Sequence, residues 1–312
     1  YLKLFKNIPL TFFIFIRYKN LLLIALTQIL VHYGFLKALN LPTALSDLNF
    51  FILSLATLFI AAAGYIINDI QDVAIDRINK PNKTFIPAPF SQNSAFNYYL
   101  VLNISGVGLG FLLSYRMGFG NFATLFVLIS ALLYVYANFL KRVLLLGNLI
   151  VSVIVASAIG IVMVFDTIPV LQGNEQQLVN PLSVLKDYAV FALMLNFLRE
   201  IIKDIEDANG DYAAGIQSLP ILLGLERTAK LSAYIAVIYI FTVLGYIYVY
   251  LQANVWISAY LVIAIVIPLV FFCIKARYAE KHKHYSFLSK LLKFIMLLGI
   301  LSLGVLTLTL KF

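Results

Sequence analysis

Nine runs of about twenty mostly apolar residues follow one another along the chain. They are centred on residues 20–38, 48–68, 95–114, 119–139, 146–165, 184–203, 231–251, 255–274 and 291–310. Each run is long enough for an α-helix to cross the hydrocarbon core of a bilayer, which takes about 20 residues. The runs are continuous rather than alternating, which favours helices over the strands of a barrel. Since 62% of the residues are hydrophobic and only 12% are charged, a soluble monomer is excluded, and we expect an all-α polytopic membrane protein.

The Lys and Arg residues between these runs are strongly sorted. Of the 23 cations, 19 fall in the N-terminal stretch and every second loop after it, and only four fall on the other side. Cytoplasmic loops carry such an excess, so nine spans with a cytoplasmic N-terminus in the cell (inner) membrane are expected. The net charge of +9 is then a topology signal and no evidence for nucleic acid binding. No linker divides the chain, so residues 1–312 are interpreted as a single integral membrane domain.

The first of two carboxylate clusters follows the second apolar run. It consists of Asn68, Asp69, Asp72 and Asp76. On a continuous helix these four side chains lie within about 100° of one another, with apolar residues on the opposite face. The sequence therefore predicts one oxygen-rich helix face at the cytoplasmic end of this span.

The second cluster lies at the end of the sixth run. Its members are Glu200, Asp204, Asp207 and Asp211, which share a narrow stripe if the helix persists. Glu206 lies off this stripe and is not expected to take part. A helix end is expected before Asp211, because Asn209-Gly210 precedes it. Solvated acidic helix ends could explain one cluster, but two are improbable, since the helix dipole disfavours carboxylates at C-terminal ends.

Carboxylates crowded this closely repel one another unless a cation or proton is present. Hard Mg²⁺ takes oxygen ligands and completes its octahedron with water and substrate phosphates. Two such faces meeting across a cavity would hold a Mg²⁺–diphosphate unit, with all eight cluster residues as candidate metal ligands. Nearby cations could donate to the phosphate oxygens that the metal leaves free. The candidates for this role are Arg77, Lys83, Lys141 and Lys203, with Asn68 beside the metal.

At these residues the sequence resembles the UbiA superfamily of intramembrane prenyltransferases. Its signature N-D-x-x-D-x-x-x-D is matched in full by residues 68–76, and Asn79-Lys80-Pro81 with Lys83 resembles the segment that follows. Tyr134, Lys141-Arg142 and Gly147-Asn148 resemble the next cytoplasmic turn, and residues 204–211 match the second aspartate motif. The second motif is most similar to the branch that geranylgeranylates geranylgeranylglyceryl phosphate. The chain departs from many relatives in having Arg17-Tyr18-Lys19-Asn20 in place of Arg-Pro-x-Asn.

The resemblance implies helices around a central cavity open to the cytoplasmic side and the bilayer. It implies a Mg²⁺-dependent transfer of a prenyl group, geranylgeranyl by the branch, from an allylic diphosphate to the hydroxyl of a lipid acceptor through an ionised allylic cation. Asp72, Asp204, Lys83 and Tyr134 are the expected catalytic residues. Rings of Tyr65, Tyr134, Tyr136 and Phe197 could face the cation, although most aromatic residues in such a chain pack helices. Arg17 and Lys19 are candidate contacts for an acceptor phosphate.

Three alternatives remain open at this stage. A quinone-pathway enzyme of the same superfamily would prenylate an aromatic acceptor. An ion-coupled transporter would place its charged residues near the bilayer midplane, whereas both clusters here fall at the cytoplasmic edge. A noncatalytic membrane scaffold would leave the two carboxylate faces unexplained. His32, in the first run, is expected to be a packed or interfacial residue rather than a ligand.

Overall fold

The computed structural model describes residues 8–79, 81 and 84–311. Within these residues, nine helices are long and apolar enough to cross a membrane. They coincide with the nine apolar runs of the sequence, so the protein is an all-helical integral membrane protein, as predicted. The helices divide into two compact units, one formed by residues 1–26, 44–143 and 209–216 and the other by residues 27–43, 144–208 and 217–312. Each unit is described separately below.

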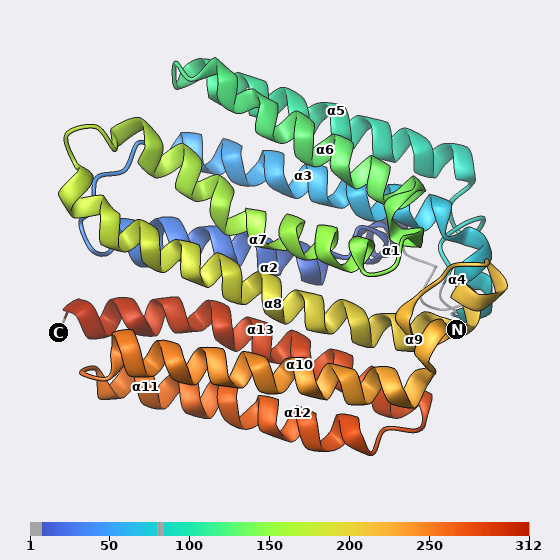
Figure 1. The fold of residues 1–312 in the computed structure, drawn as a ribbon. Coiled ribbons are helices and arrows are strands. Elements are labelled where there is room, and N and C mark those ends of the chain that lie inside the picture. The colour runs from blue at the N-terminus through green and yellow to red at the C-terminus, as the bar shows by residue number, and fades with distance from the viewer. Residues whose placement is uncertain (1–7, 80, 82–83, 312) are drawn as a thin grey trace. The chain divides into compact units, whose positions relative to one another are not determined.

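The first unit is built around α3. Its elements are α1 (Ile8–Phe15), the start of α2 (Tyr18–Ile29), α3 (Asp47–Gln71), α4 (Val73–Asn79), α5 (Gln92–Arg116), η3 (Gly120–Phe122), α6 (Ala123–Asn138) and η4 (Leu140–Arg142). Helix α3 packs along α5 and also contacts α6 (Figure 1). Ser46 and Ser91 begin α3 and α5 as N-caps, each accepting a hydrogen bond from a backbone N–H in the first turn.

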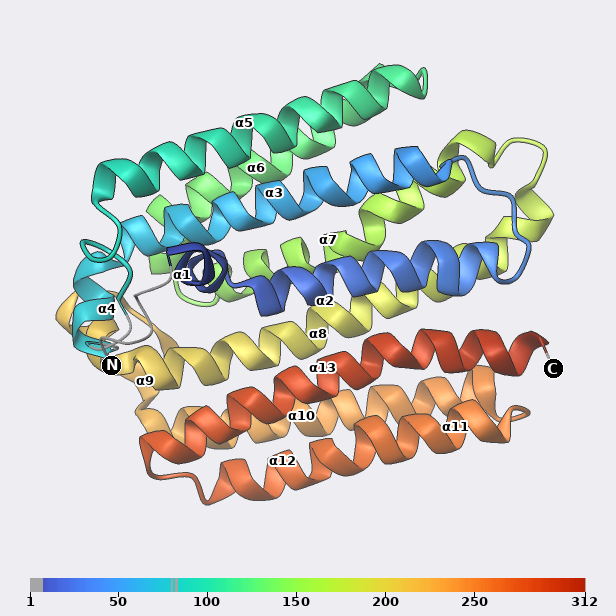
Figure 2. The same ribbon diagram turned by 180° about the vertical axis from the view of Figure 1, so that it is seen from behind.

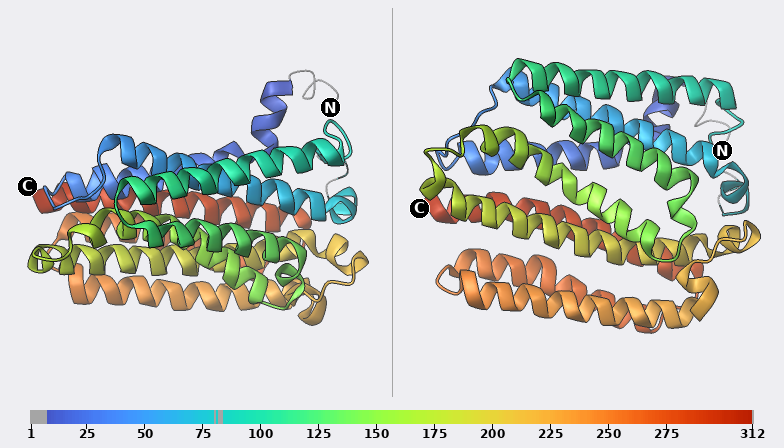
Figure 3. Two further views of the ribbon diagram at one scale, coloured as in Figure 1. Left: turned by 90° about the horizontal axis from the view of Figure 1, so that it is seen from above. Right: turned by 45° about the horizontal axis from the view of Figure 1, so that its top comes forward.

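Two glycines allow α5 to approach its neighbours closely, and α5 and α6 lie side by side in both views of Figure 3. A Cβ on Gly106 would lie 2.7 Å from Ile60 of α3, and one on Gly110 would lie 2.3 Å from the ring of Phe126 on α6. No side chain fits at either position. Small residues of this kind are how membrane helices gain packing contacts without a hydrophobic driving force between them.

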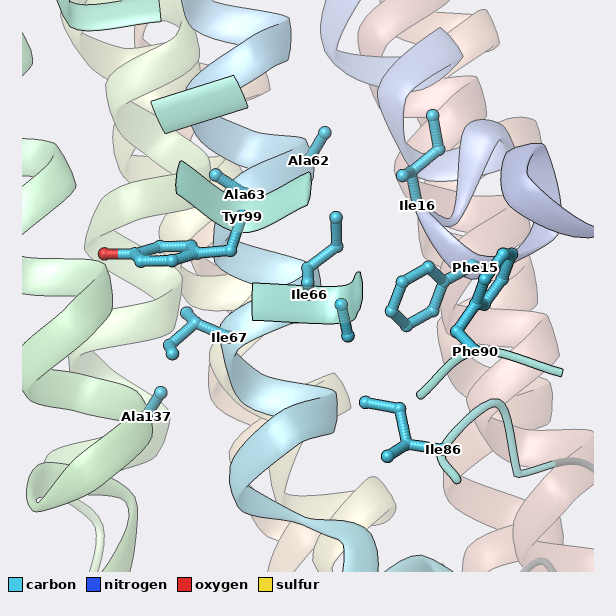
Figure 4. Packing of buried hydrophobic residues seen from close by; sticks show 11 residues of the cluster. Phe15, Ile16, Ala62, Ala63, Ile66, Ile67, Ile86, Phe90, Tyr99 and Ala137 are labelled. Carbon is cyan, nitrogen blue, oxygen red and sulfur yellow. The ribbon is translucent and has the colours of Figure 1, made fainter. Parts of the chain in front are cut away.

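Aromatic and aliphatic side chains close the end of the first unit that carries the first carboxylate cluster. The ring of Phe15 stacks on Phe90 at 5.0 Å between centroids, and Ile86 lies beside them (Figure 4). Ile66 and Ile67, one turn before the first carboxylates, belong to the same buried cluster. This packing holds the end of α3 and thereby positions the polar residues that follow.

The second unit contains the remaining long helices. Its elements are η2 (Leu30–Lys37), α7 (Leu146–Thr167), η5 (Ile168–Val170), α8 (Glu175–Ala213, of which residues 175–208 belong to this unit), α9 (Leu219–Leu223), α10 (Leu225–Tyr246), η6 (Ile247–Leu251), α11 (Val255–Leu261), η7 (Val262–Val266), α12 (Ile267–Arg277) and α13 (His282–Lys311). Helix α12 contacts both α10 and α13, and α13 also contacts η2 (Figure 2).

A buried contact between a histidine and an aspartate joins η2 to α7 inside this unit. His32 Nδ1 contacts the carboxylate of Asp166, and both side chains are fully buried. His32 is therefore a packed residue, in agreement with the prediction. Ionisable groups inside a membrane protein are paired in this way because an isolated charge is costly there.

Two sequence-based boundaries around α8 are wrong. The fifth and sixth apolar runs leave residues 166–183 between them, but α7 continues to Thr167 and α8 begins at Glu175, an acidic first-turn residue that favours a helix start. The expected stop at Asn209-Gly210 is also absent, because the helix continues to Ala213. Gly215, whose φ is +69°, terminates the helix two residues later: Ile216 N–H donates to Asp211 C=O and Gly215 N–H to Tyr212 C=O. This is a Schellman end, which a glycine in the left-handed region allows.

Candidate active site

The first carboxylate cluster lies where α3 gives way to α4. The helix is interrupted at Asp72, with φ −96° and ψ 8°, although the Asp72 and Asp76 N–H groups still donate to carbonyls four residues earlier. The four predicted residues therefore do not sit on one uninterrupted helix. Asn68 Nδ2 donates to Asp72 Oδ2 at 2.7 Å, which ties the two turns together. The interruption points the carboxylates of this cluster at different partners.

Asp69 is buried and forms an ion pair with Arg17, which lies between α1 and α2. Arg17 Nη2 lies 2.6 Å from Asp69 Oδ1, and its guanidinium carbon lies 4.9 Å from the centre of the Tyr65 ring. Arg17 sits between α1 and α2 with φ +55°, a costly backbone conformation for a non-glycine residue that is found where surrounding contacts demand it. Burial opposes the charge of Arg17, but Asp69, with help from Asp76, outweighs it and raises the pKa of the guanidinium.

Asp72 is paired with a lysine from the next cytoplasmic turn predicted by the sequence. Lys141, in η4, forms an ion pair with Asp72 Oδ1, and its side chain is only 9% exposed. The sequence predicts Lys141 as a phosphate contact, and the structure places its ammonium group directly on the first cluster. A diphosphate bound there would meet a cation already in position.

Asp76 and Arg77 extend the first cluster along α4. Asp76 is half-buried, and Arg77 is exposed. Lys83, which the sequence predicts as a phosphate contact and a catalytic residue, lies outside the described residues.

The second cluster lies on α8 in the second unit. Glu200 is buried and accepts from Lys203 Nζ at 2.7 Å and Arg199 Nη1 at 3.3 Å. Asp204 accepts a hydrogen bond from Asn148 Nδ2 at 2.7 Å. Asp207 is half-buried one turn further along the helix. This unit thus holds three of the predicted ligands on consecutive turns of a single helix, beside a predicted phosphate contact, Lys203.

The fourth predicted ligand of the second cluster, Asp211, belongs to the first unit. One residue before it, Gly210 N–H donates to Asn79 Oδ1 at 2.8 Å. A Cβ on Gly210 would lie 2.4 Å from Asn79 Nδ2, so only glycine allows this approach. The end of the second aspartate motif is therefore anchored to the segment after the first.

Two functional residues carry no role predicted from the sequence. Asn148 holds Asp204, and Ser152, one turn later, donates to the Asn148 carbonyl at 2.6 Å and is 3.3 Å from Asn196 Nδ2. Asn79 orients Gly210. Both asparagines lie in segments that match the family pattern, and this match was the only sequence signal that could have indicated a role for them. An amide side chain carries no charge from which a partner could be predicted.

The predicted aromatic residues have different surroundings. Tyr65 already stacks on Arg17, whereas Tyr134 is 43% exposed, with its ring 6.4 Å from that of Tyr99. Tyr136 and Phe197 are half-buried. Of the four side chains, that of Tyr134 is the most exposed.

The oxygen donors of both clusters suit magnesium. Within residues 8–79, 81 and 84–311, no three carboxylate, imidazole or thiol groups form a ready-made cage. Mg²⁺ does not need one, because it typically takes one or two protein carboxylates together with water and phosphate oxygens. The chemistry of the donor set, carboxylates with neighbouring cations, therefore fits a metal that arrives with a diphosphate.

Comparison with known proteins identifies the family. The model of the UbiA prenyltransferase family matches residues 29–298. Digeranylgeranylglyceryl phosphate synthase of Methanobrevibacter smithii is 32% identical over 85% of this chain and 89% of its own length. The enzyme of the same name from Korarchaeum cryptofilum is 30% identical over 77% of this chain and 80% of its own length.

Solved structures show the same fold. A structure described in work on digeranylgeranylglyceryl phosphate synthase in membranes is 25% identical, with a TM-score of 0.63 over 95% of this chain and 96% of that chain. A UbiA homologue from Archaeoglobus fulgidus, bound to GPP and Mg²⁺, has a TM-score of 0.61 at 14% identity over 94% and 99% of the two chains. The family match over most of the sequence, together with the nine apolar helices, shows that this chain belongs to the UbiA prenyltransferase family and is an integral membrane prenyltransferase.

Proposed function

We propose that this protein transfers a geranylgeranyl group from geranylgeranyl diphosphate to the hydroxyl of geranylgeranylglyceryl phosphate. The similarity to the two named synthases over more than three quarters of this chain supports this acceptor. The observation that carries the reaction type is the pairing of each carboxylate cluster with lysine, Asp72 with Lys141 and Glu200 with Lys203. Alternating carboxylates and ammonium groups are what a Mg²⁺–diphosphate needs.

The carboxylates of both clusters are the proposed magnesium ligands. They are Asp69, Asp72, Asp76, Glu200, Asp204, Asp207 and Asp211, with the Asn68 amide beside them. Bound Mg²⁺ would neutralise the charge that grows on the departing diphosphate. Asn148 and Asn68 keep the carboxylates of Asp204 and Asp72 oriented through their amide donors.

The cations supply the remaining donors. Lys141 and Lys203 can turn from their carboxylates to phosphate oxygens as the C1–O bond of the donor breaks and its electron pair passes to the diphosphate. Arg77 and Lys83 are proposed as further phosphate contacts. The hydroxyl oxygen of the acceptor then forms a bond to C1 of the allylic cation, and the hydroxyl proton passes to the released diphosphate. The exposed ring of Tyr134 is suited to face that cation, because an aromatic face attracts positive charge.

Purified protein should therefore prenylate geranylgeranylglyceryl phosphate when given Mg²⁺ and labelled geranylgeranyl diphosphate. Asp204→Asn keeps an acceptor oxygen for Asn148 but removes the charge, and should abolish turnover without unfolding the protein. Glu206→Gln is the matched control on the same helix, since Glu206 lies off the carboxylate stripe, and it should retain activity. Transfer only to 4-hydroxybenzoate or dihydroxynaphthoate would refute the lipid acceptor.

We also propose that the N-terminus and both clusters face the cytoplasm, on the strength of the 19 to four cation asymmetry. Two exposed positions at opposite ends of α8, Glu175 and Asn209, report the orientation. In a Cys273→Ser background, Asn209→Cys should be labelled by an impermeant maleimide only after the cells are opened. Glu175→Cys should be labelled in intact cells, and the reverse pattern would refute the orientation.

A further inference from the structure

An apolar cavity of about 100 Å³ lies within the second unit. One face of α8 lines it through Tyr188, Phe191 and Leu195, which are spaced so as to share that face. Gly299 and Ser302 of α13 and Tyr246 of α10 line it from other sides. Apolar cavities of this size exclude water and accept apolar ligands.

The distance along α8 between the cavity and the second carboxylate cluster follows from the helix geometry. Leu195 is five residues before Glu200 on α8, and Tyr188 is twelve residues before it. At 1.5 Å per residue the far end of the cavity lies about 18 Å along the helix from the Glu200 level. A chain whose diphosphate or phosphate lies beside the cluster would therefore reach the cavity with its distal isoprene units.

The end of the cavity farther from the cluster is closed by hydrogen-bonded and stacked side chains. Tyr188 Oη lies 2.9 Å from Ser302 Oγ, which donates to the Gly299 carbonyl at 2.7 Å. The ring of Tyr246 meets Phe191 edge to face at 5.2 Å. Because the hydroxyls of Tyr188 and Ser302 hydrogen-bond to each other, a hydrocarbon chain can end against them without leaving a polar group with no hydrogen-bond partner.

Three π-helical segments border this cavity. Leu30 and Val31 open η2, Tyr246 directly precedes η6, and Ile265 lies in η7. Such segments are rare and concentrate at functional sites, since widening a helical turn sacrifices regular hydrogen bonding. Their placement around one cavity indicates that its shape is specified rather than incidental.

Between the cavity and the cluster, α8 carries a cation. Arg199 follows Leu195 by one turn on the same face of α8, and its Nη1 contacts Glu200. Its Nε is buried and, among the described residues, has no hydrogen-bond partner. A phosphate oxygen would satisfy this donor. The second unit thus presents a cation, an apolar cavity and an aromatic end wall in that order.

We propose that this cavity receives the distal end of a phosphate-headed prenyl chain and that the Tyr188–Ser302 pair, with Tyr246, sets the longest chain the enzyme accepts. This inference rests on the proposed prenyl transfer and adds the residues that determine chain length. Either substrate, the diphosphate donor or the glyceryl phosphate acceptor, carries the required chemistry.

A shorter cavity and a deeper cavity should shift the preferred length of the prenyl chain in opposite directions. A Cβ on Gly299 meets only Ile265 Cδ1, at 3.8 Å, so Gly299→Leu can be accommodated while its side chain fills the cavity. Tyr188→Ala removes the end wall, and Tyr188→Phe keeps the ring without the hydroxyl. Gly245→Leu is the matched control, since Gly245 is exposed on α10 and a Cβ there would have nothing within 4 Å.

The measured quantity is a ratio within one preparation, so it does not depend on the folded fraction. In one arm, kcat/KM and competitive binding are compared for farnesyl, geranylgeranyl and longer prenyl diphosphates with the acceptor fixed. In the other arm, the acceptor chain is varied with the donor fixed. Gly299→Leu should shift the ratio at least about tenfold toward shorter chains and Tyr188→Ala a similar amount toward longer ones, since pocket volume discriminates on this scale. Tyr188→Phe and Gly245→Leu should stay close to the wild type.

The outcomes separate the two proposals. A shift in the donor arm assigns the cavity to the donor, and a shift in the acceptor arm assigns it to the acceptor. Unchanged ratios in both arms would overturn the chain-length assignment while leaving prenyl transfer intact. If the wild-type protein transfers no prenyl group, the proposed function is refuted. The ratios from competitive binding then still decide whether the cavity sets the length of prenyl chain that the protein accepts.

Discussion

Replacing Gly210 by alanine is expected to destabilise the end of the second aspartate motif. The new Cβ would lie 2.4 Å from Asn79 Nδ2 and 2.9 Å from Asn79 Oδ1, the atom that accepts the Gly210 N–H. Overpacking of this kind costs about 1–3 kcal/mol, and weakening the hydrogen bond adds about 0.5–1.5 kcal/mol. Alanine returns about 1 kcal/mol through its helix propensity. The net loss should be about 0.5–3.5 kcal/mol.

The free energy of unfolding in mixed micelles, titrated with SDS, measures this loss. Gly108→Ala is the control, because a Cβ there meets nothing within 4 Å, and it should leave stability unchanged or raise it slightly. Asn79→Ala removes the obstructing amide, so Gly210→Ala made in that background should cost little. An equal cost of Gly210→Ala in both backgrounds would refute the steric argument, since neighbours that clash must be coupled.

Three further perturbations test other parts of the structure. His32→Ala leaves the fully buried Asp166 carboxylate without its imidazole and should lower the free energy of unfolding by about 3–5 kcal/mol, as SDS titration would show; a loss under about 1 kcal/mol would contradict the pairing. Lys141→Gln should lower kcat/KM for the prenyl diphosphate about 10- to 100-fold, the value of a charge-assisted hydrogen bond, and an unchanged value would remove Lys141 from the site. EDTA should abolish transfer, with recovery on adding Mg²⁺, and activity that survives chelation would exclude the metal.

The spans could be predicted from the sequence because hydropathy is local, whereas the partners of the polar residues could not. Arg17 and Asp69 are 52 residues apart, and Lys141 and Asp72 are 69 apart, so no spacing rule connects them. Gly210 shows how a local rule fails. Asn-Gly usually ends a helix, but here glycine is required for contact with Asn79, and the helix ends at Gly215 instead.

The cavity of the second unit was likewise beyond sequence reasoning. Its lining residues, such as Tyr188 and Gly299, are ordinary members of apolar runs, and 14% of all residues are aromatic. Only the packing of several helices distinguishes these positions from those that face lipid. The aspartate motifs, by contrast, stand out because charge is rare in this chain.

The ion pairs on the clusters have a consequence for the life of the protein before it meets its substrates. Asp69, Asp72 and Glu200 each have a guanidinium or ammonium partner from the chain itself, so the repulsion among carboxylates is relieved as soon as the polypeptide folds. We therefore infer that the folded state of the protein needs no bound metal. A cell short of magnesium would accumulate intact, idle enzyme rather than lose it to quality-control proteolysis, and activity would return without new synthesis.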